Sequence, residues 1–411
     1  MRRRALIAGA GIGGLTAAIA LARQDFDVAI FERAPALEEI GAGIQLTPNA
    51  TRILEKLGLL DAVERRALAP RAIRIFRGRD GAALSRLPLE ARRRWGAPYL
   101  VLRRADLQAA LAERVASEPR LKLMCGMEAG GFGQDGASVT LGLKRGAVRL
   151  TERGDLLIGA DGIRSMVRER MGLGGRDEAR FAGRVAFRAT IAAKEAPPRC
   201  AEPDVSLHLG AKAHLVHYPV AGGASINIVA VIESGWRDRP NEDPWDGEAD
   251  RAVLTRAFAR WSKEAQTLLN AAPEWRAWPL LSRPPLADMA RGRVALLGDA
   301  AHPMLPFLAQ GAGQAIEDAA ALADSLGATA DVTEALAAYA RRRAARTARI
   351  QKESEEQARL YHMAGPMALA RDLGMRALGP ERLLKRYDWI YGAGITPSPS
   401  PVAEEGVTTK S

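Results

Sequence analysis

The chain is poor in cysteine and in aromatic residues, and each shortage excludes a class of protein. It has two cysteines, Cys125 and Cys200, in 411 residues, too few for a disulfide framework and without the spacing of metal ligands. We therefore expect a cytoplasmic protein that holds no metal. Aromatic residues make up 5% of the sequence and few stand among basic residues, unlike many nucleic-acid-binding surfaces.

Acidic residues are outnumbered by basic ones. The chain has 59 Lys and Arg residues against 48 Asp and Glu residues, a formal net charge of +11. The excess is mostly scattered Arg, and its densest groups, Arg92–Arg94 and Arg341–Arg343, are short. A solvated face, or attraction of an anionic substrate or cofactor, explains this charge better than nucleic acid, which we do not expect as a partner.

Long uninterrupted hydrophobic runs are also missing. The basic start at residues 1–4, before a mostly small or apolar segment, resembles a signal peptide or a membrane span. Four glycines inside that segment would weaken a helix, and residues 23–25 follow without a cleavage signal. We expect neither export nor stable membrane insertion. A composition of 47% hydrophobic and 26% charged residues predicts instead a globular protein with a sizeable core.

The most informative stretch is residues 5–33. An apolar run at residues 5–8 predicts a buried parallel strand, and a second run at residues 28–31 ends on Glu32. A helical pattern lies between the two runs. A strand, a glycine-rich turn, a helix and a second strand ending in an acid predict a dinucleotide site, with Glu32 accepting the hydroxyls of an adenosine ribose.

The glycines of this stretch have separate physical tasks. Gly9, Gly11 and Gly14 are spaced G-x-G-x-x-G. We expect Gly9 to allow the tight turn and Gly11 to let a pyrophosphate approach the helix N-terminus. Gly14 would let the helix pack closely on the strand.

Two more apolar strands run into glycine-rich turns. Residues 155–158 precede the turn Gly159–Gly162, and residues 294–297 precede the glycine-containing segment 298–313. Ligands bind at the carboxyl ends of strands in an open α/β sheet, so the three strand ends are expected to line one site. A helix that begins near Gly311 would direct unpaired N–H groups at it, with an ordinary tight turn as the alternative there.

The remaining segments predict a second sheet and several helices. Residues 72–77 and 83–87 predict a hairpin, and the alternation across residues 181–232 predicts an antiparallel sheet with one solvated face. We expect helices at residues 48–57, 249–270, 331–361 and, after a break at Gly365-Pro366, to about 390. The predicted division is a discontinuous nucleotide-binding domain (1–70, 100–178 and 281–330), a second domain (71–99 and 179–280), C-terminal helices (331–391) and a disordered tail (392–411).

With these motifs placed, the chain resembles the single-component flavoprotein aromatic hydroxylases, the family of p-hydroxybenzoate, salicylate and 3-hydroxybenzoate hydroxylases. The resemblance covers residues 3–390 and depends on GAGIGG…FER (9–14 and 31–33), GADGIRS (159–165) and LLGDAAHP (296–303). It implies an α/β fold: a Rossmann-like FAD-binding domain of the p-hydroxybenzoate hydroxylase type, an antiparallel-sheet substrate domain and C-terminal helices.

The resemblance also implies how FAD is held. FAD would lie extended, with Arg104 near its pyrophosphate, Asp299 on the ribityl chain and Pro306 beside the flavin. The amides of Ala312 and Gly313 would face the pyrimidine end of the ring. Asp161 is associated in the family with FAD and nicotinamide nucleotides, and a plain helix N-cap is its alternative. The expected cofactor-binding residues are Gly9, Gly11, Ile12, Gly13, Gly14, Glu32, Arg33, Gly43, Arg104, Asp161, Asp299, Pro306, Gly311, Ala312 and Gly313.

The expected catalytic residues are His214 and Tyr218. Strand periodicity places them on one face of HLVHYPV and His217 on the other. Their spacing is similar to the substrate-site pair of the 3-hydroxybenzoate 6-hydroxylase and 6-hydroxynicotinate 3-monooxygenase branch. His214 could take a phenolic proton and Tyr218 could hydrogen-bond the phenolate or carboxylate. A polar pair satisfied inside a sheet is the alternative.

Two residues near LLGDAAHP have a different expected role. His302 looks like a packed, hydrogen-bonded residue in this motif, with direct chemistry as the alternative. Phe307 stands where related enzymes often carry a polar residue, which predicts a more apolar pocket than a pyridine hydroxylase would need.

The implied reaction is a monooxygenation. NADH or NADPH would bind transiently and reduce FAD, and a flavin C4a-hydroperoxide formed with O2 would hydroxylate a small phenolic or heteroaromatic acid. A nicotinamide-dependent dehydrogenase would explain only the first motif, and nothing favours a flavin-binding regulator. The same chemistry on a larger lipid, quinolone or polyketide substrate shares every motif and stays open, as does the choice between monomer and homodimer.

Overall fold

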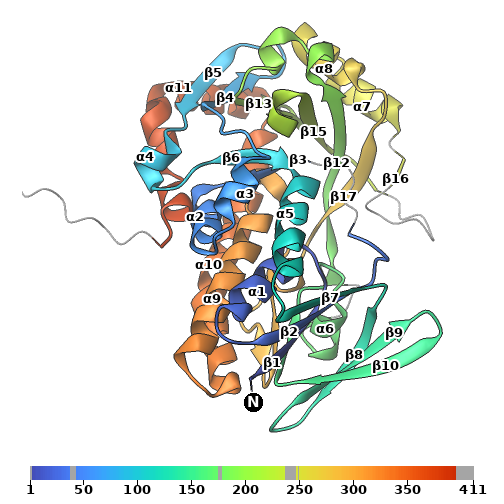
Figure 1. Ribbon diagram of the computed structural model, residues 1–411. Coiled ribbons are helices and arrows are strands. Elements are labelled where there is room, and N and C mark those ends of the chain that lie inside the picture. The colour runs from blue at the N-terminus through green and yellow to red at the C-terminus, as the bar shows by residue number, and fades with distance from the viewer. Residues whose placement is uncertain (1, 38–42, 175–177, 237–246, 249, 395–411) are drawn as a thin grey trace, which may run out of the picture.

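Two large sheets, one above the other in Figure 1, are joined by long helices along one side of the molecule. The computed structural model describes residues 2–37, 43–174, 178–236, 247–248 and 250–394. From residue 395 on, the tail predicted at 392–411 lies outside these described residues.

The lower sheet contains the three strands that precede the glycine-rich turns. Its six strands are ordered β18-β19-β11-β1-β2-β7, and all neighbours except β18 and β19 are parallel. Ala5, Leu6 and Ile7 of β1 are completely buried, as expected for a parallel strand covered on both faces. The bounds are β1 Arg4–Ala8, β2 Asp27–Glu32, β7 Leu121–Cys125, β11 Leu156–Gly159, β18 Ala290–Arg291 and β19 Val294–Leu296.

Helices rich in alanine cover this sheet closely. Helix α1 (Ile12–Ala22) is buried around nearly its whole circumference because it packs against α5 (Arg104–Ala116) and α9 (Gly311–Ala328). Helix α9 also contacts α2 (Pro48–Lys56) and α10 (Val332–Tyr361). The predicted helices at 48–57 and 331–361 are therefore confirmed, and α10 begins where Asp331 accepts hydrogen bonds from the Thr333 and Glu334 amides.

The upper sheet is mixed and has eight strands. Their order is β16-β17-β12-β15-β14-β13-β4-β5, and only β13 and β4 are parallel neighbours. The hairpin of β4 and β5 was predicted from the sequence. The bounds are β4 Ala72–Arg77, β5 Ala83–Pro88, β12 Arg180–Ala192, β13 Val205–Gly210, β14 Ala213–Val220, β15 Ser225–Glu233, β16 Gly247–Glu248 and β17 Arg276–Ser282.

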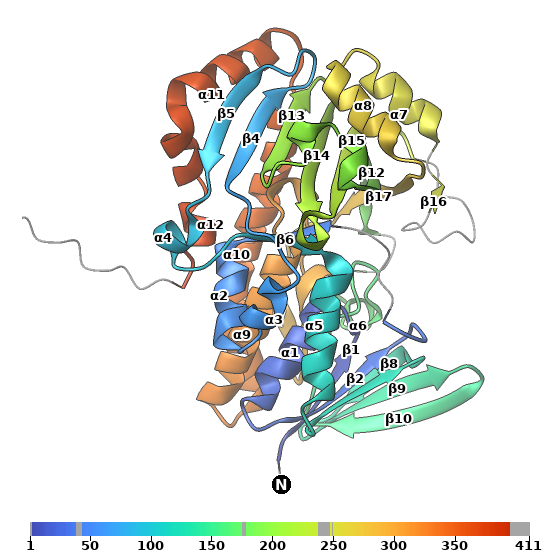
Figure 2. The ribbon, with the colours of Figure 1, turned by 45° about the horizontal axis from the view of Figure 1, so that its top comes forward.

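Two predictions for this region, one for the sheet and one for the helix beside it, are wrong. Neither face is solvated, because α7 (Arg251–Phe258) and α8 (Lys263–Ala271) cover one face (Figure 2). Phe258 of α7, Leu268 of α8 and Trp261 of the connection between them pack against it. The single helix expected at 249–270 is divided, since Ser262 accepts a hydrogen bond from the Ala265 amide and starts a new helix. The opposite face packs against the C-terminal helices α11 (Gly365–Lys385) and α12 (Asp388–Tyr391).

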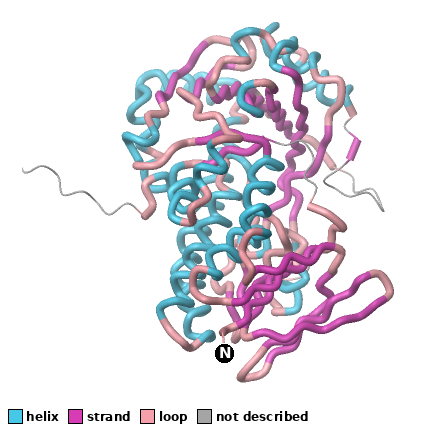
Figure 3. The backbone as a smooth tube through the Cα atoms, in the orientation of Figure 1, coloured by secondary structure: helices cyan, strands magenta, loops and turns pink. Residues whose placement is uncertain are grey.

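Smaller elements complete the fold. The strands β8 (Glu128–Gln134), β9 (Val139–Arg145) and β10 (Val148–Gly154) form a separate sheet that projects from the lower part of the molecule (Figure 3). The pair β3 (Gly43–Leu46) and β6 (Leu100–Arg103) lies between the two large sheets. Three short helices are α3 Leu60–Glu64, α4 Ala91–Trp95 and α6 Met166–Arg170. We propose that the two large sheets mark the two domains expected from the sequence.

Candidate active site

Three strand ends meet at one edge of the lower sheet. The Ala160 amide donates to the Ala8 carbonyl at 2.8 Å, and the Leu297 amide donates to the Gly159 carbonyl at 2.9 Å. The turns after β1, β11 and β19 therefore lie side by side although more than a hundred residues separate each from the next. The three strand ends lie together as expected, and their shared role in one ligand site stays a prediction.

The glycine turn after β1 has the geometry that its spacing predicts. Gly9 has φ +102°, and a Cβ there would lie 2.4 Å from the Ala160 oxygen. A Cβ at Gly14 would lie 2.0 Å from the Gly9 oxygen, so any side chain would push α1 off the strand. Gly11 differs, because nothing lies within 4 Å of its Cβ position. The loop is therefore tightly packed at Gly9 and Gly14, and it leaves free space at Gly11, where a pyrophosphate is expected.

Two further expected residues stand at the start of α1. Ile12 is its first residue and is buried. A Cβ at Gly13 would lie 2.4 Å from Cδ2 of Leu297, so this glycine brings α1 against the turn after β19.

Glu32 closes this turn from the end of β2. Its carboxylate accepts hydrogen bonds from the Ala10 and Ala34 amides, each at 2.9 Å. A carboxylate has about four lone-pair sites, so two remain for ribose hydroxyls. Arg33 is exposed next to it. The ribose contact of Glu32 and the cofactor contact of Arg33 stay predictions.

Asp161 serves as a helix cap in this structure. Its carboxylate accepts hydrogen bonds from the Ser165 hydroxyl at 2.5 Å and from the Met166 and Val167 amides at 2.8 and 3.1 Å. Burial nevertheless raises the pKa of Asp161. The N-cap residue of α6 is Ser165, and Asp161 supports the same helix start from four residues earlier. A cofactor contact of Asp161 stays a prediction.

The turn after β19 presents Asp299 near a cation. Asp299 has an accessible side chain, yet desolvation raises its pKa against the opposing charge of Arg104. Arg104 is exposed at the first turn of α5. Arg104 is close enough to Asp299 for its charge to affect the Asp299 pKa. The two residues could therefore contact the same ligand.

A buried ionic network between α9 and α10 stabilises the turn after β19. The sequence analysis did not predict this network. Asp318 of α9 accepts hydrogen bonds from the Gly298 amide at 2.9 Å and from Arg343 at 2.6 Å, and its carboxylate lies 2.6 Å from Nε2 of His302. Glu317 binds Arg343 and Arg346, each at 2.6 Å. His302 therefore packs against Asp318, in agreement with its expected structural role. In the sequence, the adjacent acids Glu317 and Asp318 within an alanine-rich helix could have indicated this network.

Helix α9 begins at Gly311, as predicted from the glycine-rich segment. The first amides of any helix, here those of Gly311, Ala312 and Gly313, have no intrahelical partner. Pro306 begins a short 3₁₀ turn, Pro306–Leu308, directly before this helix. These residues lie as the flavin assignments require, although the assignments themselves stay predictions.

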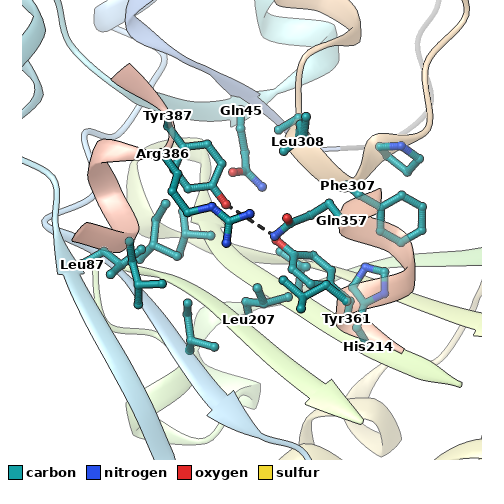
Figure 4. Close-up of a pocket in the computed structure, with 18 of the residues that line it drawn as sticks. Gln45, Leu87, Leu207, His214, Phe307, Leu308, Gln357, Tyr361, Arg386 and Tyr387 are labelled. Carbon is teal, nitrogen blue, oxygen red and sulfur yellow. Dashed lines mark hydrogen bonds between the residues drawn. The ribbon is translucent and has the colours of Figure 1, made fainter. Parts of the chain in front are cut away.

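A cavity of about 110 Å³ lies where β3, β4, β13 and β14 meet the C-terminal helices. Its walls are mostly apolar, including Leu87, Leu207 and Phe307. Figure 4 shows His214, Phe307 and Tyr361 on one side and Arg386 and Tyr387 across from them. The polar lining residues are Gln45, Tyr99, His214, Gln357, Tyr361, Arg386, Tyr387 and Tyr391. Of these, only His214 was predicted from the sequence.

The expected catalytic pair is divided by this geometry. His214 lines the cavity, and Tyr218 does not. The structural reason is Gly43 of β3, which covers Tyr218 so closely that a Cβ there would lie 2.8 Å from its ring. Burial raises the pKa of Tyr218, and a hydrogen bond with Gln45 opposes that rise. Gln45 itself lines the cavity, so Tyr218 contacts a residue of the cavity wall. The catalytic role of Tyr218 stays a prediction.

The histidines of β14 face opposite sides, as their spacing predicted. His217 points away from the cavity and lies 3.1 Å from Nε2 of His208. His214 is fully surrounded, and its Nδ1 lies 2.9 Å from Nε2 of His362. Burial lowers the pKa of His214 well below its usual value, with the charges of His362 and Arg184 acting in the same direction. His214 is therefore a neutral imidazole near pH 7, with one nitrogen able to accept a proton.

Two classes of feature are absent from the described ranges. Within residues 2–37, 43–174, 178–236, 247–248 and 250–394, no helix is long and apolar enough to span a bilayer. In the same ranges no three His, Cys, Asp or Glu side chains are grouped as metal ligands.

Comparison with known proteins extends these observations. Residues 2–354 match the FAD binding domain family. The chain is 37% identical to the 3-hydroxybenzoate 6-hydroxylase of Polaromonas naphthalenivorans, over 95% of this chain and 96% of that one. It is 38% identical to a 3-amino-4-hydroxybenzoate 2-monooxygenase of Streptomyces platensis, over 96% and 97%. The structure matches that of Klebsiella pneumoniae HpxO complexed with FAD and uric acid, with a TM-score of 0.82 and 26% identity over 93% and 95%.

Proposed function

The chain belongs to the FAD binding domain family and is an FAD-dependent aromatic monooxygenase, and from this premise we propose that it hydroxylates a small phenolic or heteroaromatic acid with NADH or NADPH and O2. The observation that carries the proposal is the small cavity with His214 in its wall. A cavity of about 150 Å³ is known to hold a benzene molecule. About 110 Å³ is therefore on the scale of one ring.

The residues at the edge of the lower sheet fit FAD. The open space at Gly11, the acid at the end of β2 and the start of α9 are suited to a pyrophosphate, a ribose and a flavin respectively. When bound, FAD supplies redox chemistry that the side chains lack, namely electrons from NAD(P)H and activation of O2. The protein supplies binding, orientation and exclusion of water.

His214 is the proposed base for the phenolic hydroxyl. A deprotonated phenol is the stronger nucleophile toward electrophilic oxygen, and His214 is neutral and ready to accept the proton. The apolar wall formed by Leu87, Leu207 and Phe307 keeps bulk water from the reacting ring. Phe307 makes this pocket less polar, as its place in the sequence predicted.

Arg386 is the proposed partner of the substrate carboxylate. It carries the only fixed charge among the described residues that line the cavity. A guanidinium binds a carboxylate in a planar two-point contact. With His214 across the cavity from Arg386 (Figure 4), the pair would orient a ring that has a hydroxyl and a carboxylate at different positions.

The same chemistry on a larger lipid, quinolone or polyketide remains the second candidate. The cavity volume favours the small acid, because a larger molecule would require the C-terminal helices to move apart. The two candidates separate in a panel of aromatic acids. We expect NAD(P)H oxidation by the yellow, FAD-loaded protein to be slow alone and several-fold faster with a suitable hydroxybenzoate. Stimulation only by extended substrates would overturn the small-acid proposal.

A further inference from the structure

The wall of the cavity is connected to the surface by three polar side chains. Nδ1 of His214 lies 2.9 Å from Nε2 of His362, which follows the end of α10. Nδ1 of His362 lies 3.2 Å from Oε1 of Glu233 at the end of β15. The His362 side chain is 1% exposed and that of Glu233 is 33% exposed. The series thus begins at the cavity and ends in water.

Glu233 determines which nitrogens of this series carry hydrogen. A carboxylate only accepts hydrogen bonds, so Nδ1 of His362 must be the protonated nitrogen of that ring. Nε2 of a neutral His362 is then an acceptor, and Nδ1–H of His214 donates to it. The remaining nitrogen of His214, Nε2, is left unprotonated. It has no hydrogen-bond partner among the residues that the structure describes.

We propose that His362 and Glu233 are positioning residues that hold His214 in the tautomer competent as a base and carry the phenolic proton from the cavity to solvent. The proton-carrying part depends on the proposed function, whereas the tautomer does not. The phenolic proton moves to Nε2 of His214, the Nδ1 proton of His214 moves to Nε2 of His362, and the Nδ1 proton of His362 moves to Glu233. Glu233 then releases one proton to water, so protons are conserved. The series is reset by the reverse shift, in which Glu233 takes one proton from water and Nε2 of His214 returns one proton to the oxygen of the product.

The charges around the series support neutral imidazoles. Arg184 of β12 lies 3.3 Å from Glu233 and lowers the pKa of both histidines. Arg371 of α11 acts on His362 in the same direction. Burial is the largest cause for His362, whose pKa falls to about 4 despite Glu233, which raises it. Near pH 7 no fixed positive charge resides on either ring.

The chain contains a matched control. His208 and His217 form a second buried pair, 3.1 Å apart, on the opposite face of β14. Phe76 stacks on His208, and neither histidine lines the cavity. A change in this pair perturbs a buried imidazole contact of the same kind without touching the proposed series.

Nuclear magnetic resonance of the FAD-loaded protein, labelled with ¹⁵N at its five histidines, tests the tautomers without any substrate. We expect Nδ1–H and unprotonated Nε2 for both His214 and His362, with signals assigned by His214→Asn and His362→Gln. Glu233→Leu removes the acceptor and should abolish this pattern, while His217→Gln should leave it unchanged. An Nε2–H tautomer of His214 in the wild type would overturn the proposal.

Turnover tests the proton-carrying part, with 3-hydroxybenzoate as the probe. Glu233→Gln keeps an acceptor oxygen but cannot take a proton, so we expect at least a tenfold loss of hydroxylation and a changed pH profile. Glu233→Asp should restore most of the rate, and His217→Gln should match the wild type. An unchanged rate and pH profile in Glu233→Gln would disprove proton transfer. If the wild type neither binds nor converts 3-hydroxybenzoate, the proposed function fails for this acid, and the tautomers still decide the positioning role.

Discussion

At the scale of single residues, burial explains why a histidine can serve as a base here. An exposed imidazole would be partly protonated near neutral pH, but enclosure by Phe307, Tyr361 and His362 lowers the pKa of His214 far below that range. The environment thus supplies both the charge state and the direction of the acceptor nitrogen.

We predict unequal effects for the two residues that the sequence paired. General-base assistance is typically worth ~10²–10⁴-fold, so His214→Asn should lower hydroxylation by an amount in that range. Tyr218→Phe should cost less than about tenfold, because Tyr218 does not line the cavity and instead hydrogen-bonds Gln45, which does. Product formed per NAD(P)H consumed is the measurement. His217→Asn is the control, and a loss confined to that variant would show that the wrong face of β14 was chosen.

At the scale of elements, the turn between β1 and α1 separates packing from ligand binding. Gly14→Ala would force α1 away from β1, because its Cβ would lie 2.0 Å from the Gly9 oxygen. We expect this variant to be strongly destabilised or not to fold. Gly11→Ala has open space and φ −68°, so we expect near-normal thermal stability without FAD and clearly weaker FAD retention. Equal loss of stability in both variants would contradict this separation.

The connection between α9 and α10 predicts a specific acid sensitivity. Although burial raises the pKa of Asp318, the charges of His302 and Arg343 lower it to about 2 from the usual 3.8. A depressed folded-state pKa stabilises the protein above pH 4, and this stability, roughly 2 kcal/mol, is lost as the pH falls from about 4 to 2. Asp318→Asn should lower stability at pH 7 by about 3–5 kcal/mol, because Arg343 keeps a buried charge with one fewer partner.

Denaturation at a series of pH values measures this effect. Asp324→Asn on the exposed face of α9, where the carboxylate pairs with Arg342, is the control. Asp318→Asn should also lose much of the stability change between pH 4 and 2. A variant that keeps the wild-type acid profile would show that another carboxylate is responsible.

At the scale of the whole molecule, the net charge of +11 should attract anions. A long-range field raises association rates and is screened by salt over about 10 Å at 0.1 M ionic strength. We therefore expect kcat/KM for an aromatic acid to fall severalfold from low to physiological ionic strength. A neutral phenol without the carboxylate is the control and should respond weakly. Equal salt dependence for both compounds would exclude steering by charge.

Features that depend on residues close together in the chain could be predicted from the sequence. The strand, glycine turn and helix at residues 4–22 have a pattern complete within a few turns of chain, and so does the Asp331 cap of α10. The meeting of the three strand ends was also predicted, because it follows from the general geometry of open α/β sheets. Individual side-chain contacts made at long range could not be predicted. His362 is 148 residues from His214, and only the tertiary fold brings the C-terminal end of α10 beside β14. Likewise, Ser206 and Asn227 looked like solvated positions, yet both are buried. Asn227 accepts a hydrogen bond from the Gly43 amide of β3, a contact across 184 residues of chain.

The order of strands in the lower sheet has a consequence for biosynthesis. The central strand β1 pairs with β11, and β11 pairs with β19. The sheet that begins with residues 4–8 therefore cannot be completed until residues 294–296 have been synthesised. At about 5–20 residues per second, translation of the intervening chain takes roughly 15–60 s. Throughout that interval the ribosome-bound chain carries apolar strands with unpaired edges and no complete cofactor site. Newly made chains would then need protection by chaperones until the third strand has emerged, and FAD could act as a folding partner only at that late stage.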